Sequence, residues 1–218
     1  MREWATVPGR CQPDVDVEFD RQVRVLVDAD CPAFAGLSPE VFVDLLEPLR
    51  KVTRTAGDSP WLIVLSESLI PASSLVPLLR LPGSDRPGVV DRNFGDELLD
   101  AYRPLPTLGV PDAPAYLLLG VERGDEFRGV RPKEAVPVIE SRGRTPLTIH
   151  EGLAFALQVP SSLQKNHCYM LAGSRAGHKR VPAIWIADKA PKLGWCWDGN
   201  HHTWLGIASA EGRRGPLL

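Results

Sequence analysis

The 218-residue sequence has no apolar run long enough to cross a membrane. Its longest apolar stretches, "WLIVL" (61–65) and "AYLLLGV" (115–121), are far shorter than the about 20 residues that a spanning helix needs. The N-terminal stretch "MREWATVPGRCQPDVD" carries charges but no apolar segment of the kind found in signal peptides. We therefore expect a cytoplasmic protein that has no membrane partner.

Cysteine is also scarce, with four residues and no C-x-x-C pair, which excludes a disulfide-rich scaffold. Reduced thiols are the simplest interpretation, and they agree with a cytoplasmic location. The histidines and cysteines lack the spacing of familiar zinc motifs, and adjacent strand residues point to opposite faces. We expect neither a metal nor another cofactor, although the residues considered for a metal site were His167, Cys168, His178, Cys196, His201 and His202.

The phosphate-binding Walker A and G-x-G-x-x-G motifs are missing, so the familiar kinds of nucleotide site are not supported. A pI near 6.2 makes nucleic acid an improbable partner. The charge is uneven, however, because residues 141–218 carry a net +6 and residues 1–140 a net −8. Either the two oppositely charged halves attract each other within one domain spanning 1–218, or the basic half binds an anion. The oligomeric state is left open.

Proline, in contrast, is abundant, and its 21 residues predict short helices and many connections. Helical spacing of apolar residues predicts helices over 18–31 and 37–52, the second starting at Ser38 and Pro39. Pro48 predicts a kink or break in that helix. The first half of the chain also predicts short helices over 71–80 and 132–143 and a buried strand over 60–67. A second buried strand followed by a turn is expected over 114–127, and a long loop or linker over 82–114 with a short helical piece near 95–102.

The second half predicts one capped helix followed by strands. Thr148 and Glu151 form the T-x-x-E pattern of a capping box at the start of a helix over 145–160. Four apolar segments then predict an antiparallel meander, with strands over 168–174, 180–188, 192–198 and 203–209. The fold class is therefore α+β, with N-terminal helices and a few strands before the capped helix and the meander. The tail from Glu211 onward is expected to be loose.

Several long segments resemble an uncharacterised actinobacterial family, domain of unknown function number 5701. They are "GRTPLTIHEGLAFAL", "GSRAGHKRVPAIWI" and "APKLGWCWDGNHHTWLG", and the resemblance extends from about residue 40 onward. The resemblance implies no activity, so the function has to be argued from the residues.

The segment "GWCWDGNHHTWLG" (194–206) concentrates aromatic and polar side chains. A two-residue turn at Asp198-Gly199 or at Gly199-Asn200 would make it a β-hairpin. Both registers place Cys196, Asp198, His201 and Thr203 on one face, and Trp195, Trp197, His202 and Trp204 on the other. Such a tryptophan face is either part of the core or the wall of a pocket.

Three functions remain open. The leading hypothesis is recognition of a small anionic or aromatic metabolite, with charge, stacking surface and hydrogen bonds from Arg144, Arg175, Lys192, Trp195, Trp197, Asn200, His202 and Trp204. The first alternative is a hydrolase or transferase that uses Cys196 with His201 or His202. The second alternative is a structural or partner-binding protein in which the tryptophans are only core.

Overall fold

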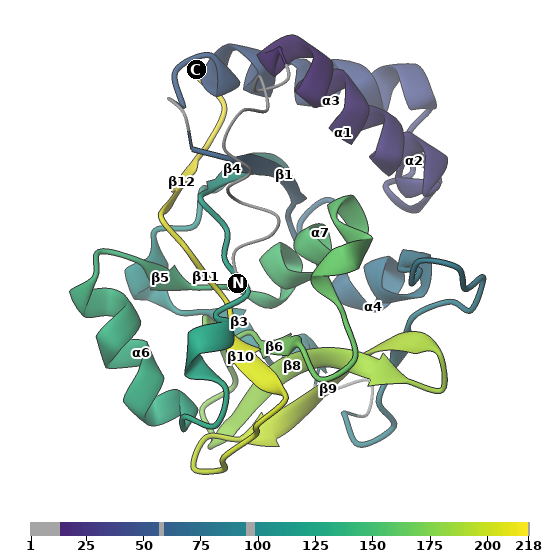
Figure 1. Ribbon diagram of the computed structural model, residues 1–218. Helices are drawn as coiled ribbons and strands as arrows, with labels where there is room; N and C mark the ends of the chain where they lie inside the picture. The colour runs from purple at the N-terminus through teal and green to yellow at the C-terminus, as the bar shows by residue number, and fades with distance from the viewer. Residues whose placement is uncertain (1–13, 57–58, 95–98, 218) are drawn as a thin grey trace.

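The computed structural model describes residues 14–56, 59–94 and 99–217. Three helices form one end of the molecule and a five-stranded sheet the other, with a three-stranded sheet and helix α7 between them (Figure 1). The helices at the first end are α1 (Val15–Asp28), α2 (Cys31–Phe34) and α3 (Pro39–Thr53).

The predicted start of α3 is confirmed, because the Ser38 side chain accepts a hydrogen bond from the Val41 amide and Pro39 follows at the first helical position. Helix α3 continues through Pro48 to Thr53 without a break. The break that Pro48 predicts therefore does not occur.

The three-stranded sheet contains β12 (Gly212–Arg214), a strand that the sequence did not predict. The central strand β4 (Ala115–Leu119) lies between β1 (Trp61–Leu65) and β12, and both pairings are antiparallel. The expectation of a loose C-terminal tail is wrong for β12, whose Arg213 pairs with Leu118. The backbone of β12 is satisfied by the free edge of β4, which explains why these polar residues form a strand.

The five-stranded sheet has the order β10-β6-β8-β9-β2. Its strands are β2 (Val89–Val90), β6 (Cys168–Met170), β8 (Arg180–Ala187), β9 (Ala190–Trp197) and β10 (Leu205–Ile207). The antiparallel pairs β6–β8 and β8–β9 agree with the predicted meander. β2 and β10 pair in parallel at the two edges, so the sheet is mixed and the fold class is α+β.

The predicted hairpin between 192–198 and 203–209 is wrong. β10 pairs in parallel with β6, on the far side of the sheet from β9. The edge of β9 that the hairpin would have used is occupied by β2, which comes from the segment predicted as a loop. Residues 198–204 therefore form a connection across the end of the sheet instead of a tight turn.

Helix α7 (Ile149–Gln158) confirms the predicted capping box, with the Thr148 and Glu151 side chains each bonded to the other's backbone amide. It packs against β1 and α1. Helix α6 (Pro132–Ser141) ends before Gly143, whose φ of 71° suits glycine. The remaining elements are α4 (Ala72–Leu75), β3 (Arg103–Pro104), β5 (Thr145–Pro146), β7 (Ser174–Arg175), β11 (Ser209–Ala210) and the 3-10 turns 76–78, 106–108, 125–127 and 160–162.

One hydrophobic core runs through the described part of the chain, and its largest buried side chains include Phe19, Phe42, Tyr116, Phe155 and Tyr169. Among the described residues, no helix is long and apolar enough to span a bilayer. Strands from both halves of the sequence share sheets, since β12 pairs with β4 and β2 with β9.

Candidate functional site

Two tryptophans on β9 form an open aromatic surface. Trp195 and Trp197 lie on the same face of the strand, and their ring centroids are 5.2 Å apart in an edge-to-face arrangement. Trp197 is 45% exposed, which is unusual for so large an apolar side chain. Trp195 is partly buried and donates its indole N–H to the carbonyl of Asn93 at 3.2 Å.

Arg180 covers this aromatic surface. The strand register places Arg180 opposite Trp197, and its guanidinium carbon lies 4.3 Å from the ring centroid of Trp195 and 5.5 Å from that of Trp197. Both distances are within the range of a cation–π interaction. Across the described residues, the Arg180 guanidinium makes no ion pair and no hydrogen bond. Its positive charge is therefore not neutralised by a carboxylate of the residues that the structure describes.

His178 lies beside Arg180 with a fixed tautomer. The backbone N–H of Arg180 donates to Nδ1 of His178 at 3.2 Å. Nδ1 is therefore an acceptor, so the neutral ring carries its proton on Nε2. Nε2 is buried and has no hydrogen-bond partner in the described part of the chain. The ring thus presents a buried N–H donor that is not used.

Tyr102 supplies a second unused donor next to His178. The two rings meet edge to face with centroids 5.4 Å apart, and Tyr102 is only 3% exposed. Its hydroxyl, too, lacks a hydrogen-bond partner within residues 14–56, 59–94 and 99–217. Burial raises the pKa of Tyr102 to about 12, against the opposing effect of the nearby Arg180 and Arg175 charges. The hydroxyl is therefore protonated and able to donate at neutral pH.

We call these five residues, Tyr102, His178, Arg180, Trp195 and Trp197, the arginine–tryptophan cluster. Buried donors are almost always satisfied in folded proteins, so unused ones require an explanation. Two buried N–H or O–H groups and one uncompensated guanidinium all call for an oxygen acceptor that carries negative charge. The cluster can therefore hold an anion beside an aromatic surface.

Three of the eight residues predicted to bind a ligand lie in or beside the arginine–tryptophan cluster. Trp195 and Trp197 belong to the cluster, and Arg175 lies at its edge, where its guanidinium pairs with Asp198 at 3.3 Å. Lys192 lies on the opposite face of β9 and pairs with Asp91 at 3.1 Å. The charge of Lys192 is therefore paired with Asp91 and does not belong to the cluster.

Trp204 and His202 also lie away from the cluster. The ring of Trp204 packs edge to face against Trp185, with centroids 6.2 Å apart. Trp185 pairs with Lys192 and so lies on the face opposite Trp195. His202 packs against Trp204 at 5.7 Å. The prediction that Trp195 and Trp204 share a face is wrong, because it depended on the hairpin that does not form.

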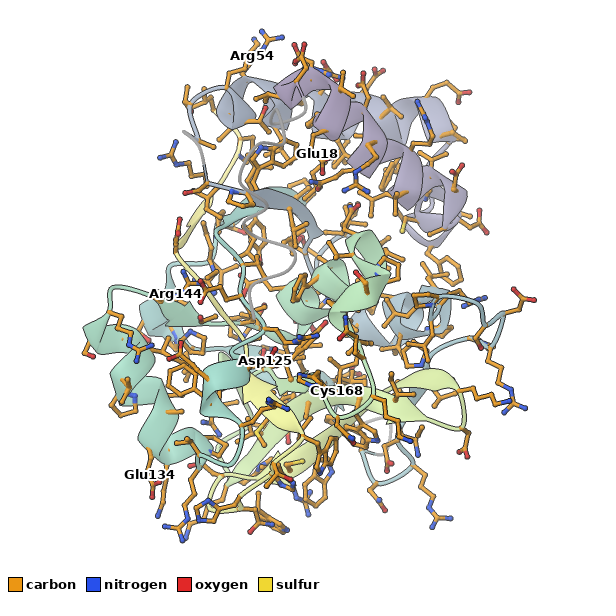
Figure 2. The ribbon with its side chains drawn as sticks, viewed as in Figure 1. Glu18, Arg54, Asp125, Glu134, Arg144 and Cys168 are labelled. Carbon is orange, nitrogen blue, oxygen red and sulfur yellow. The ribbon has the colours of Figure 1, made fainter. Side chains whose placement is uncertain are left out.

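Arg144 and Asn200 are the last two predicted residues. Arg144, labelled in Figure 2, is largely buried and donates to the hydroxyl of Ser209 and the carbonyl of Gly120, so it joins the segments that follow β4 and β10. Asn200 is exposed in the connection after β9, where its backbone N–H donates to the carbonyl of Trp197. The structure does not bring either side chain into the cluster.

The proposed catalytic pair of Cys196 and His201 is not assembled. Cys196 lies opposite Val181 on β8, and burial raises the pKa of its thiol to about 12. His201 bonds through Nδ1 to the carbonyl of Gly129 at 2.7 Å. Burial, and secondarily the charge of His201, lowers the pKa of His202. The thiol of Cys196 is therefore protonated at neutral pH, which does not favour a nucleophile.

No group of three or more histidine, cysteine, aspartate or glutamate residues suited to a metal ion occurs in the part of the chain that the structure describes. Tyr102 is the cluster residue that the sequence did not indicate, because it lies at the end of the short helical piece expected near 95–102, in the segment 82–114 that is otherwise predicted as a loop. His178 and Arg180, in contrast, stand in the basic segment "SRAGHKR" next to Arg175, which was a visible signal.

Comparison with known proteins identifies a family but not an activity. A family model described as "Family of unknown function (DUF5701)" matches residues 25–216. No curated protein and no solved structure matches the chain. Because the family model covers most of the sequence, the protein belongs to the DUF5701 family, whose function is unknown.

Proposed function

We propose that the protein binds a small anionic metabolite with a planar, aromatic part at the arginine–tryptophan cluster. The observation that carries this proposal is that three polar groups without a hydrogen-bond partner among the described residues lie on neighbouring residues: the Tyr102 hydroxyl, the Nε2–H of His178 and the guanidinium of Arg180. All three can donate, the His178 Nε2–H and the Arg180 guanidinium can only donate, and Arg180 is charged, which favours a carboxylate or phosphate group over a cationic one.

The aromatic part of the ligand is inferred from the tryptophans. Trp197 leaves nearly half of its surface uncovered, and a flat ring could stack on it at little cost in conformational entropy. Pockets for small molecules commonly combine such apolar walls with a few polar groups that fix orientation. Cys31, Cys168 and Cys196 are free thiols, which supports a cytoplasmic location for this binding.

Replacing Arg180 by glutamine is expected to weaken anion binding by about ten-fold or more, because a charge-assisted hydrogen bond contributes about 1.5–3 kcal/mol. Sodium benzoate and inorganic phosphate are suitable probes, titrated against the full chain at constant ionic strength while the indole N–H resonances are followed by NMR. Benzoate should saturate and shift the Trp195 and Trp197 signals most strongly.

Lys179→Gln is the matched control, since Lys179 is an exposed cation on the neighbouring residue. It should leave both affinities nearly unchanged, because exposed charges act weakly at physiological ionic strength. If Arg180→Gln binds the probes as well as the unaltered protein does, or if neither probe saturates, the proposed function is wrong. The structural alternative, in which the tryptophans only complete the fold, would then be favoured.

Tyr102→Phe should separate binding from stability. The substitution removes a buried hydroxyl that has no partner among the described residues, so the free energy of unfolding should stay the same or rise by up to about 1 kcal/mol. Benzoate affinity should fall about five- to ten-fold, because the bound anion loses one donor. Urea unfolding and the same NMR titration measure the two effects.

Tyr116→Phe is the matched comparison, because the Tyr116 hydroxyl is equally buried but donates to Glu151 at 3.0 Å. Removing that hydroxyl should destabilise the fold by about 1–3 kcal/mol, since a buried carboxylate oxygen loses one of its donors. A similar loss for Tyr102→Phe would mean that the Tyr102 hydroxyl is already satisfied within the protein, which contradicts its proposed role.

A further inference from the structure

Strand β9 has an open edge beside the arginine–tryptophan cluster. The backbone N–H of Asp198, directly after the strand, donates to the carbonyl of Lys179 at 2.8 Å, so Asp198 turns its backbone groups toward β8. Backbone groups alternate in direction along a strand, and those of Trp197 and Trp195 therefore point away from β8. The outer edge of β9 thus carries the backbone N–H and C=O groups of these two tryptophans.

Neighbouring segments close this edge at both ends and leave its middle open. The carbonyl of Leu193 accepts from the N–H of Asp91 at 2.7 Å, where the pairing with β2 ends. The carbonyl of Trp197 accepts from the N–H of Asn200 at 3.0 Å. Between them, the backbone N–H and C=O of Trp195 and the backbone N–H of Trp197 have no hydrogen-bond partner among the residues that the structure describes. This open stretch offers two donors and one acceptor over about 7 Å.

The charge beside the open stretch is positive. Arg180 stands on β8, but its guanidinium lies over the tryptophan rings of β9 and so brings its charge toward this edge. The carboxylates of Asp91 and Asp198, in the segments that flank the stretch, are each paired with another cation, at 3.1 and 3.3 Å. A carboxylate of a ligand would therefore meet a cation that is not yet neutralised.

We infer that the ligand of the arginine–tryptophan cluster is an N-acylated amino acid, whose amide pairs with the open stretch of β9 as a residue of a further strand would. This inference rests on the proposed function and names its class of ligand. The amide N–H of such a ligand can donate to the Trp195 carbonyl, which is the acceptor of the open stretch.

The remaining groups of an N-acylated amino acid fit the same place. Its carboxylate is one carbon atom removed from the amide N–H, so it can accept from a backbone N–H of Trp195 or Trp197 and from the Arg180 guanidinium. Residues that lie opposite each other on neighbouring strands share a face of the sheet. A planar acyl group can therefore reach the exposed ring of Trp197.

Two other occupants of the edge agree less well with these observations. A long peptide strand needs a longer row of open backbone groups, whereas the carbonyls of Leu193 and Trp197 are already bonded on either side. A second copy of the chain that paired through the same edge would bring two Arg180 guanidinium groups together around a twofold axis, and like charges repel.

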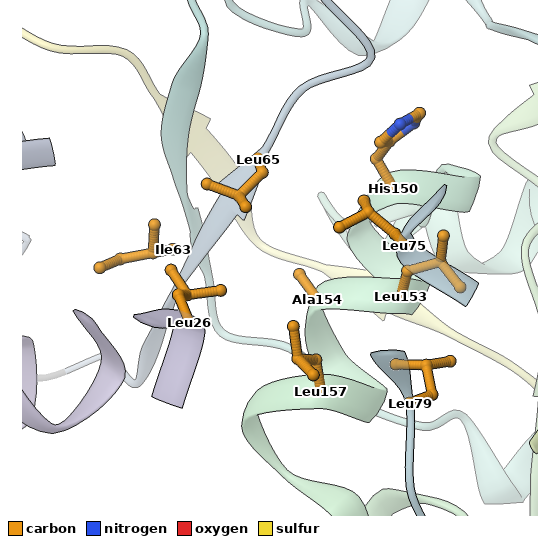
Figure 3. A pocket seen from close by; sticks show the side chains of 9 residues that line it. All are labelled: Leu26, Ile63, Leu65, Leu75, Leu79, His150, Leu153, Ala154 and Leu157. Carbon is orange, nitrogen blue, oxygen red and sulfur yellow. The ribbon is translucent and has the colours of Figure 1, made fainter. Parts of the chain in front are cut away.

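The two pockets beside α7 are too small for this ligand. The first is apolar and is lined mainly by leucines of α1, β1, α4 and α7 (Figure 3). Its open space is about 10 Å³, and that of the second, which Tyr102 and His150 line, is about 20 Å³. Each has room for roughly one or two water molecules. The open edge of β9 sets no such limit on a molecule with a ring, an amide and a carboxylate.

The test is a pair of NMR titrations of the full chain at constant ionic strength. Hippurate, which is N-benzoylglycine, carries the ring, the amide and the carboxylate. 3-Benzoylpropionate has the same length but a CH2 group in place of the N–H. Hippurate should bind about three- to ten-fold more tightly, because its N–H adds one hydrogen bond. The carbonyl ¹³C resonance of Trp195 should move to higher frequency with hippurate and much less with 3-benzoylpropionate.

Two controls separate the amide from the charge. Arg180→Gln should weaken the binding of both acids by a similar factor and preserve their ratio, because it removes the cation and leaves the strand edge intact. The Asp198 N–H is the internal control for solvent exchange, since it is already bonded to Lys179. Bound hippurate should slow the exchange of the Trp195 or Trp197 amide proton at least about five-fold and leave that of Asp198 unchanged.

Equal affinities for hippurate and 3-benzoylpropionate would overturn this inference, while benzoate binding that depends on Arg180 would still support the proposed function. If neither these two acids nor benzoate saturates, both proposals are wrong. Tighter binding of an acetylated hexapeptide of alternating glutamate and valine would indicate a protein partner instead. Protection of the Trp195 amide that grows with protein concentration would indicate a second copy of the chain. Either of these last two results would also contradict the inference.

Discussion

Replacing Arg213 by methionine is expected to lower the free energy of unfolding by about 3–5 kcal/mol, the range typical of breaking a buried ion pair. The side chains of Arg213 and Glu151 are 2% and 0% exposed, and two bonds join them, from Nε to Oε1 at 2.5 Å and from Nη2 to Oε2 at 2.8 Å. Removing the cation leaves the Glu151 carboxylate buried without a compensating charge, which costs more than the pair itself contributes.

Two further hydrogen bonds hold the Glu151 carboxylate in its buried position when Arg213 is replaced. One of its oxygens accepts from the Thr148 amide at 2.7 Å, and the other accepts from the Tyr116 hydroxyl at 3.0 Å. These bonds fix the start of α7, while Arg213 also donates to the hydroxyl of Thr145 at 2.7 Å. Helix α7, strand β5 and strand β12 therefore meet at one charged group.

Urea unfolding of three variants measures this effect. Arg214→Met is the matched control, because Arg214 is the exposed neighbour on the same strand and its loss should cost no more than about 0.5 kcal/mol. The double variant Glu151→Gln/Arg213→Met should be more stable than Arg213→Met alone, since a neutral amide needs no compensating charge. Its oxygen can accept from the Thr148 amide and its NH2 can donate to the Tyr116 hydroxyl oxygen. A loss below about 1 kcal/mol for Arg213→Met would contradict a desolvated ion pair.

The sequence predicted most local elements correctly because their signals are local. Helix α3 begins where Ser38 and Pro39 indicate, and α7 begins at the Thr148–Glu151 capping box. The strands β1 and β4 follow from short apolar runs, each of which begins directly after a proline. None of these features depends on which distant segment packs beside them.

The errors concern which strands become neighbours. The segment 209–214 has few apolar residues, so nothing local indicates that Arg213 is needed to neutralise Glu151, 62 residues earlier in the sequence. In the same way, Val89 and Val90 occupy the edge of β9 although they lie in a segment rich in loop signals. Pairing between distant segments is decided by tertiary packing, which short sequence patterns do not encode.

Contacts between distant segments were also what the sequence could not predict at the candidate site. The alternation of side chains along a strand correctly placed Trp195 and Trp197 together, because that inference needs only one strand. Placing Trp204 with them required a hairpin, and placing Tyr102 beside His178 required knowledge of a contact across 76 residues of chain. The basic segment around Arg180 was visible, but its stacking on the tryptophans was not.

The position of β10 depends on two glycines. A side chain on Gly206 would meet the backbone carbonyls of Arg123 and Gly124, and one on Gly124 would meet the backbone of Ile207. The Ile207 amide donates to the Gly124 carbonyl at 3.3 Å, so the two segments are joined as well as close. This close approach holds β10 against β6 and away from β9, which explains why the predicted hairpin does not form.

Gly124→Ala should therefore destabilise the protein by about 3 kcal/mol or more. Two costs combine. The first is backbone strain of about 1–2 kcal/mol, because a φ of 73° is unfavourable for any residue with a Cβ. The second is a collision of the new methyl group with the backbone of Ile207, which cannot rotate out of the way. Gly83→Ala isolates the first cost, since Gly83 has the same φ of 73° and nothing within 4 Å of the added carbon.

Urea unfolding should show Gly124→Ala to be at least about 2 kcal/mol less stable than Gly83→Ala, the difference reporting the collision alone. Similar losses for the two variants would mean that β10 can shift without cost, and that Gly124 does not determine its place in the sheet. Because β10 follows directly on residues 198–204, a displaced strand should also move His202 and Trp204, whose ring contact can be followed by NMR. The arginine–tryptophan cluster lies on the other face of the β8–β9 pair, so the Trp195 and Trp197 signals should change less.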